Sequence, residues 1–198
     1  MKKKELEMRL QALQAKFPRP DPGLEQYLTP PKMVADMLFD AFLLGDIGGK
    51  EVIDLGCGTG TFAMGAYLLG ANVTGVDVDP EALEVARSIN PKIAYICADV
   101  ADFYPERRWD TSIQNPPFGS QRRGADRPFI AKSAEIAKTL YTIHLDKSAD
   151  FIRGQIFRLG GRITHEKGYK FPIPYTYDHH KKEVERIDVK MFRVMWNV

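Results

Sequence analysis

The sequence has little of what marks several broad classes of protein. Its 198 residues include only two cysteines, and these form no CxxC pair, which fits neither a disulfide framework nor a zinc site. The formal net charge is only +2, so no overall positive field predicts nucleic-acid binding. No apolar run approaches the roughly 18 residues of a membrane span, and no apolar segment follows the lysines at the N-terminus as in a signal peptide. We therefore expect a cytoplasmic protein without a membrane segment.

What is present suits one domain over residues 1–198. This length matches one domain of roughly 100–200 residues, and an apolar content of 44% is enough for a full core. The first residues predict a helical extension at about 1–17, packed on the domain, because one apolar stripe recurs at helical spacing before the first proline. Its members are Leu6, Leu10, Leu13 and Phe17. The alternative is a solvated basic arm.

The rest of the chain alternates as a parallel α/β sheet demands. Thr29 followed by two prolines predicts a helix start, with Thr29 as the cap and Pro30 at the first helical position. Strand, loop and helix then alternate five times, which predicts a doubly wound, Rossmann-like α/β fold. The expected strands are 52–55, 72–76, 93–97, 110–114 and 140–145, and the expected helices are 61–69, 80–89, one carrying Phe129 to Ala137, and 149–159.

The C-terminal stretch has a different pattern. Apolar residues alternate up to Met191 and then continue in the opposite phase from Phe192, which predicts one long strand with a bulge near Met191. Pairing with a strand at 162–166 would form an antiparallel hairpin on one edge of the parallel sheet. The two strands bring the expected sheet to seven.

A glycine loop follows the first expected strand. Its glycines, Gly56, Gly58 and Gly60, permit a tight turn and a ligand close to the backbone. The dinucleotide fingerprint requires a glycine where Thr61 stands, which argues against a nicotinamide or flavin dinucleotide. Asp77 ends the second strand, where a carboxylate can accept both hydroxyls of a ribose. Asp99 ends the third strand and can accept a hydrogen bond from an adenine amine.

This arrangement resembles the class I S-adenosylmethionine methyltransferases, which carry an acidic glycine loop after the first strand and an acid after the second. The resemblance implies S-adenosylmethionine as the cofactor, Asp77 at its ribose and Asp99 at its adenine. Taken one at a time, the aspartates could equally be helix caps at strand ends. The residues assigned to the cofactor on the first strand's loop are Asp54, Gly56, Gly58, Thr59, Gly60 and Thr61.

Asn115-Pro116-Pro117-Phe118 ends the fourth strand at the same edge. The Asn115 side-chain oxygen and the Pro116 carbonyl can accept the N–H groups of an amine nucleophile. The prolines keep these acceptors at a fixed separation, and Phe118 offers a face on which a flipped base could stack. The motif is similar to that of methyltransferases acting on the nitrogens of adenine, cytosine or glutamine side chains.

The segment from Leu24 to Pro30 narrows the resemblance to the small-subunit ribosomal RNA adenine-N6 methyltransferase-like family. That likeness implies that Gln26 and Thr29 contact the cofactor, that residues 115–118 form the catalytic loop, and that ribosomal RNA is the substrate. It also implies a small zinc-binding activator protein as a partner, pairing with an edge strand near Tyr95 and Ile96.

Local clusters of basic and aromatic residues favour RNA as the substrate, because they suit phosphate contact and base stacking. The expected RNA contacts are Arg122, Arg123, Lys170, Tyr177, His180, Lys181 and Lys182. The paired histidines at 179 and 180 lack a second ligand cluster, so we expect no metal. Two other functions stay open: methylation of a protein glutamine or a DNA adenine, and RNA binding without catalysis.

Overall fold

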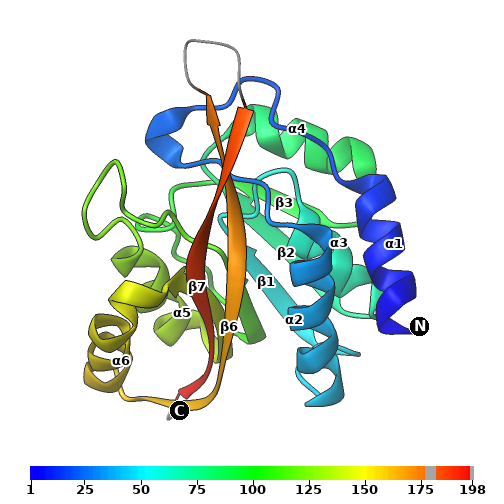
Figure 1. The fold of residues 1–198 in the computed structure, drawn as a ribbon. Coiled ribbons are helices and arrows are strands. Elements are labelled where there is room, and N and C mark those ends of the chain that lie inside the picture. Colours follow the sequence, from blue (N-terminus) through cyan, green and yellow to red (C-terminus); the bar gives the residue numbers. More distant parts are fainter. Residues whose placement is uncertain (177–181, 197–198) are drawn as a thin grey trace.

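A seven-stranded mixed sheet forms the centre of the computed structural model, which describes residues 1–176 and 182–196 (Figure 1). Its strand order is β3-β2-β1-β4-β5-β7-β6, with the first five strands parallel and the last two antiparallel to their neighbours. The expected doubly wound sheet with a C-terminal hairpin is confirmed. The strands are β1 (Glu51–Leu55), β2 (Asn72–Asp77), β3 (Ala94–Cys97), β4 (Trp109–Gln114), β5 (Ala137–Leu145), β6 (Gly161–Thr176) and β7 (Lys182–Trp196).

Helices cover both faces of this sheet (Figure 1). On one face α1, α2 and α3 share a core with residues of β6 and β7, and on the other face α5 and α6 pack against β5 and β7. No helix within the described residues is long and apolar enough to cross a membrane. The α-helices are α1 (Lys3–Leu13), α2 (Pro31–Leu43), α3 (Thr61–Leu68), α4 (Pro80–Ile89), α5 (Arg127–Ile136) and α6 (Ala149–Arg158), with short 3-10 turns η1 (Pro22–Leu24) and η2 (Asp146–Ser148).

The N-terminal helix is packed on the domain as expected, with Leu6 and Leu10 buried. It is shorter than its apolar stripe, because α1 ends at Leu13 and Phe17 lies beyond it. The ring of Phe17 lies instead against Gly58, where an added Cβ would come within 2.8 Å of it. Of the four residues in the stripe, Leu6 and Leu10 are buried, Leu13 is exposed and Phe17 is half-buried, covering the glycine loop.

The start of α2 differs from the expectation by one residue. Pro30 is the N-cap and Pro31 the first helical residue, and no side chain caps the helix. The expected cap, Thr29, uses its hydroxyl elsewhere: it accepts a hydrogen bond from Asn115. A proline at the first helical position needs no N–H partner, so the helix can begin without a side-chain cap. Similarly, Ala137 belongs to β5 and not to the preceding helix.

The expected bulge near Met191 is wrong. The pairing of β5 with β7 runs without a shift from Val189 to Met195, and the irregularity lies in β6, between Ile163 and His165. The apolar phase changes in β7 because this strand lies inside the sheet and both of its faces are covered. Met191 faces the core of α1 to α3, whereas Phe192 faces the core of α5 and α6.

The hairpin of β6 and β7 is also longer than the expected strand at 162–166. Pairing with β5 stops at Leu145 opposite Val189, but β6 and β7 stay paired as far as Thr176 opposite Lys182. Since β5 is parallel to β4, this extension, which we call the hairpin arm (residues 170–176 and 182–188), projects beyond the carboxyl edge of the parallel strands. Figure 1 shows the arm rising past the sheet.

Candidate active site

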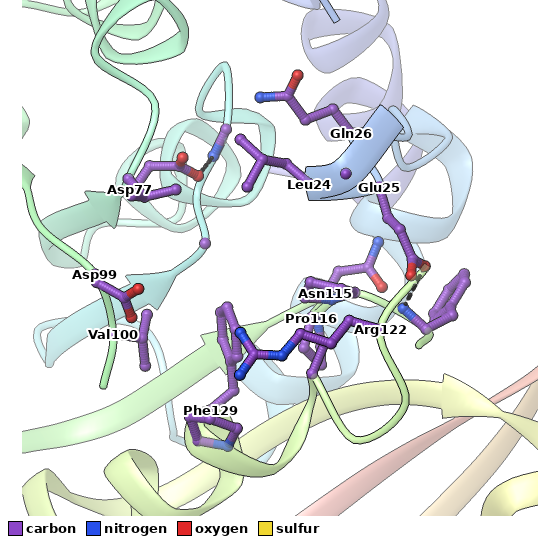
Figure 2. A pocket seen from close by; sticks show the side chains of 18 of the residues that line it. Leu24, Glu25, Gln26, Asp77, Asp99, Val100, Asn115, Pro116, Arg122 and Phe129 are labelled. Atoms are coloured by element: carbon purple, nitrogen blue, oxygen red, sulfur yellow. Dashed lines mark hydrogen bonds between the residues drawn. The ribbon is translucent and has the colours of Figure 1, made fainter. Parts of the chain in front are cut away.

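A cavity of about 380 Å³ lies where β1, β2, β3 and β4 end. This volume is within the range of roughly 300–1,000 Å³ typical of small-molecule pockets, and loops at the carboxyl ends of parallel strands are where such folds bind ligands. Figure 2 shows side chains from several separate segments around the opening. Of the residues expected from the sequence to contact a ligand, the cavity is lined by Gln26, Gly56, Gly58, Asp77, Asp99, Asn115, Pro116, Pro117, Phe118, Arg122 and Arg123.

The remaining residues assigned to the cofactor do not line this cavity: Thr29, Asp54, Thr59, Gly60 and Thr61. Asp54 is buried beneath the glycine loop and accepts a 2.9 Å hydrogen bond from the backbone N–H of Ala63, in the first turn of α3. Burial raises the pKa of Asp54 to about 8. Thr59 donates to the carbonyl of Ala15, in the segment after α1. These side chains support the loop from behind, because the loop's tight turn directs them away from the opening.

The glycine loop has the conformation that a close ligand requires. Gly56 and Gly58 have φ values of 71° and 52°, a region that side chains seldom occupy. Added Cβ atoms there would come within 2.9 Å of Phe129 and 2.8 Å of Phe17, respectively. The loop therefore has room for two aromatic rings and an open cavity only because these positions carry no side chain.

Asp77 lies next to the glycine loop at the wall of this cavity. Its carboxylate accepts hydrogen bonds from the backbone N–H of Gly58, at 2.7 Å, and of Asp79, at 2.9 Å. Burial raises the pKa of Asp77, although both backbone donors act in the opposite direction. Asp99 is more exposed and accepts from the N–H of Ala101. The cavity thus has one half-buried acid at its β2 wall and one exposed acid at its β3 wall.

The segment that follows β4 carries an unusual acceptor on Asn115, a residue that lines the cavity. The side-chain N–H of Asn115 donates a 2.9 Å hydrogen bond to the hydroxyl of Thr29. The other end of that amide, Oδ1, is buried and has no hydrogen-bond partner among the described residues. A buried acceptor without a partner is costly. Such an atom beside a cavity is a candidate for contact with a ligand's N–H or O–H group.

Phe118 is half-buried and lines the cavity. Its ring packs edge to face against Phe171 of the hairpin arm, with the ring centroids 5.4 Å apart. This edge contact is one of the favoured arrangements of an aromatic pair. It ties the hairpin arm to the loop of residues 115–121, which we call the NPPF loop.

Sequence reasoning missed Glu25. Its side chain is 7% exposed, and its carboxylate accepts hydrogen bonds of 2.9 Å from the N–H of Phe118 and 3.0 Å from the N–H of Gln121. Gln26, the next residue, lines the cavity but donates its side-chain amide to Asp79. The sequence signal for Glu25 was only its place beside Gln26, since composition and spacing do not distinguish a buried acid from a solvated one.

The residues expected to contact RNA are spread over several elements. Arg122 and Arg123 line the cavity, and the Arg122 side chain extends across its opening between Pro116 and Phe129 (Figure 2). Lys170 lies away from the cavity, on the hairpin arm, and forms an exposed ion pair of 2.6 Å with Asp188. The expected contacts Tyr177, His180 and Lys181 lie outside the described residues. Of Lys182, at the start of β7, only the backbone is described.

Comparison with known proteins shows that this chain is similar to methyltransferases. A model of the methyltransferase domain family matches residues 52–123. The rRNA N(6)-adenosine-methyltransferase METTL5 of Danio rerio is 32% identical over 98% of this chain and 98% of its own length. An uncharacterized protein of Methanocaldococcus jannaschii is 40% identical, over 98% of this chain and 94% of its own. The crystal structure of a putative RNA methyltransferase from Pyrococcus horikoshii is 41% identical and covers 100% of this chain and 99% of its own, with a TM-score of 0.90.

Proposed function

The chain belongs to the family of the rRNA N(6)-adenosine-methyltransferase METTL5, and we propose that it methylates the N6 amine of an adenine in RNA, with ribosomal RNA as the substrate. Two relatives that carry this name, from Danio rerio and Drosophila melanogaster, match 98% of the chain at 31–32% identity. The observation that carries the proposal is the free acceptor of Asn115 at the cavity. An adenine amine provides the N–H group that this atom lacks.

S-adenosylmethionine fits the cavity's donor and acceptor pattern. Gly56 and Gly58 leave the backbone open to a ligand. Asp77 would hold the ribose hydroxyls, and Asp99 would accept from the adenine amine. Apolar side chains, among them Val100 and Phe129, also line the cavity. When bound, the cofactor supplies a methyl group on an activated sulfonium, so the protein needs no strong general base.

The protein's contribution is then to orient the target amine. Asn115 Oδ1 and the Pro116 carbonyl would accept its two N–H groups, which turns the nitrogen lone pair toward the cofactor side of the cavity. Pro116 and Pro117 hold both acceptors on a rigid backbone. Phe118 would stack on the flipped base, a contact worth about 1–3 kcal/mol, and the proton can leave to water after transfer.

The RNA strand would lie between the loop after Phe118 and the hairpin arm. Arg122 and Arg123 suit phosphate contacts on the loop side. On the other side, the arm projects past the carboxyl edge and touches Phe118 through Phe171. Lys181 and Lys182, which the sequence predicts as RNA contacts, would extend this surface. We propose that this activity is cytoplasmic.

The activator partner is a further proposal, and β3 is its docking strand. β3 forms one edge of the sheet, and the Ile96 side chain is 39% exposed on it. An exposed edge strand with free backbone groups can pair with a strand of another chain. Tyr95, named with Ile96 from the sequence, instead turns inward against Gly60 and Gly75, so Ile96 is the side chain that would meet the partner.

A second enzyme function, methylation of a protein glutamine, uses the same acceptors. Incubation of the purified protein with labelled cofactor, total RNA and a protein fraction in parallel, followed by nucleoside mass spectrometry, separates the two. We expect N6-methyladenosine in RNA from the wild type, and a loss of roughly 10²–10³ in turnover for Asn115→Ala, with cofactor affinity kept within about threefold. Label only in protein would overturn the RNA assignment, and wild-type turnover in Asn115→Ala would overturn the role of that acceptor.

A further inference from the structure

The segment from Glu25 to Thr29 holds the NPPF loop at both of its ends. At the start of the loop, Thr29, which is 6% exposed, accepts the 2.9 Å hydrogen bond from the Asn115 side-chain amide. Further along, the Glu25 carboxylate accepts from the N–H groups of Phe118 and Gln121. All of these contacts are made by side chains of the short segment to groups about 90 positions away in the sequence.

Glu25 is itself fixed in an uncommon conformation. Its φ is 50°, in the left-handed region that residues other than glycine seldom adopt and that persists only where surrounding contacts maintain it. Its N–H donates to the carbonyl of Pro22, and its carbonyl accepts from the N–H of Tyr27. Figure 2 shows the Glu25 side chain directed from this turn to the backbone of the NPPF loop. The buried carboxylate therefore holds that backbone in place through two hydrogen bonds.

The same segment also reaches the opposite wall of the cavity. The Gln26 side chain donates a 2.7 Å hydrogen bond to Asp79, the N-cap of α4, two residues after Asp77. Adjacent side chains thus connect the wall assigned to the cofactor with the NPPF loop. Thr29 contacts the NPPF loop through Asn115 and does not line the cavity.

We propose that Glu25 and Thr29 are positioning residues that set the geometry of the Asn115 acceptor, and so control turnover and not cofactor affinity. The inference rests on the function proposed for the NPPF loop. The Thr29 hydroxyl accepts from the N–H end of the Asn115 amide, so Oδ1 is the end of that amide left without a partner among the described residues. Without the Thr29 hydroxyl, the Asn115 amide can rotate and turn its NH₂ group toward the target amine. That amine needs an acceptor for its N–H groups, so a donor at this position would not hold it. Glu25 keeps the backbone beyond Pro117 in place.

The test of Thr29 compares two substitutions with a matched control. Thr29→Val keeps the shape and removes the hydroxyl, and we expect kcat to fall at least tenfold while the dissociation constant of S-adenosylmethionine stays within threefold. Thr29→Ser restores the hydroxyl and should recover kcat to within threefold of the wild type. Thr111→Val is the control, because Thr111 is equally buried and loses a 2.7 Å hydrogen bond to Asp46 at the other end of β4; its kcat should be unchanged. Weaker cofactor binding with unchanged kcat in Thr29→Val would make Thr29 a cofactor residue and overturn the proposal.

Glu25→Gln tests the contact between the Glu25 carboxylate and the NPPF loop backbone independently of activity. Glutamine has one acceptor oxygen where glutamate has two, so one of the two backbone donors must lose its partner. We expect amide hydrogen exchange at Phe118 or Gln121, followed by NMR, to accelerate at least tenfold, with cofactor affinity within threefold. Unchanged exchange at both amides would overturn the proposal. This readout needs no methylation, so a wild type that fails to methylate RNA would contradict the proposed function without deciding the role of Glu25.

Discussion

The carboxylate of Asp77 accepts a 2.7 Å hydrogen bond from the backbone N–H of Gly58. The acid at the end of β2 and the glycine loop after β1 are therefore held as one unit, although the residues are 19 positions apart. A ligand that binds Asp77 meets a carboxylate already oriented by two backbone donors. Such preorganisation lowers the cost of ordering the site on binding.

Replacement of Asp77 tests its role in cofactor binding. Asp77→Ala should weaken S-adenosylmethionine binding by about 1–3 kcal/mol, because it removes a charged hydrogen-bond partner. Isothermal titration calorimetry measures this, and Asp102→Ala is the control, since Asp102 is an exposed acid outside the cavity wall. Unchanged affinity in a folded Asp77→Ala protein would remove Asp77 from the binding site.

Asp54 should make stability depend on pH. Its pKa is raised from 3.8 to about 8 in the folded protein, with burial as the first cause. The stability that its protonated form contributes is therefore complete below pH 3.8 and lost as pH rises through about 8. The Asp54→Asn side chain carries no charge at any pH. The free energy of unfolding of this variant should therefore rise relative to that of the wild type by up to about 1.4 kcal/mol per pH unit within this window.

Urea unfolding of both proteins at pH 5, 6.5 and 8 would measure that difference. Other titrating groups are common to both proteins and cancel. The substitution should leave cofactor affinity unchanged, because Asp54 lies behind the glycine loop and not on the cavity wall. Parallel stability curves would show that Asp54 is ionised in the folded protein, and a loss of cofactor binding would restore its sequence-based assignment.

Binding to single-stranded RNA should depend on salt through the arginines at the cavity. Each phosphate contact contributes about −0.7 to the slope of log affinity against log salt, so changing Arg122 and Arg123 together to Ala should flatten the slope by roughly 1 to 1.5. Changing Lys181 and Lys182 together to Ala should likewise flatten it by roughly 1 to 1.5. Phe118→Ala should leave the slope intact and reduce methyl transfer, because it removes a stacking face and no charge.

The control for this series is the double change of Arg158 and Arg162 to Ala. Both arginines are basic residues near the amino edge of the parallel strands, far from the cavity, and Arg158 is exposed. Fluorescence titrations at several salt concentrations measure the slopes. Equal flattening in the control would mean that RNA binds without a preferred surface, and a salt-independent affinity would favour a protein substrate.

A zinc-binding activator that pairs with β3 should stabilise the protein. A partner that binds only the folded state raises the melting temperature, and Ile96→Lys should abolish that rise without changing the melting temperature of the isolated chain by more than a few degrees. Phe157→Lys, at an 80% exposed position on α6, is the matched control and should keep the rise. An enzyme that is fully active and indifferent to the activator would contradict the proposal.

The sequence predicted the architecture because the architecture depends on local patterns of residues. Apolar runs, glycine and proline stops, and aspartates at strand ends each depend on a few neighbouring residues, and the order of strands and helices follows from them. The same patterns placed Asp77, Asp99 and Asn115 at one edge of the sheet, since parallel strands end together. Local patterns could not decide the cause of the phase change at Met191, because a bulge and a strand buried on both faces produce the same sequence of apolar residues.

Only the tertiary structure decided how these residues face one another. Thr29 follows a helix-capping pattern in the sequence, yet its hydroxyl bonds Asn115, 86 positions away. Asp54 belongs to the glycine motif but lies beneath it, and Glu25 looks like any surface acid until the NPPF loop is brought to it. The physical reason is that side-chain direction at a turn, and the partner of a polar group, depend on contacts across the fold that no local spacing encodes.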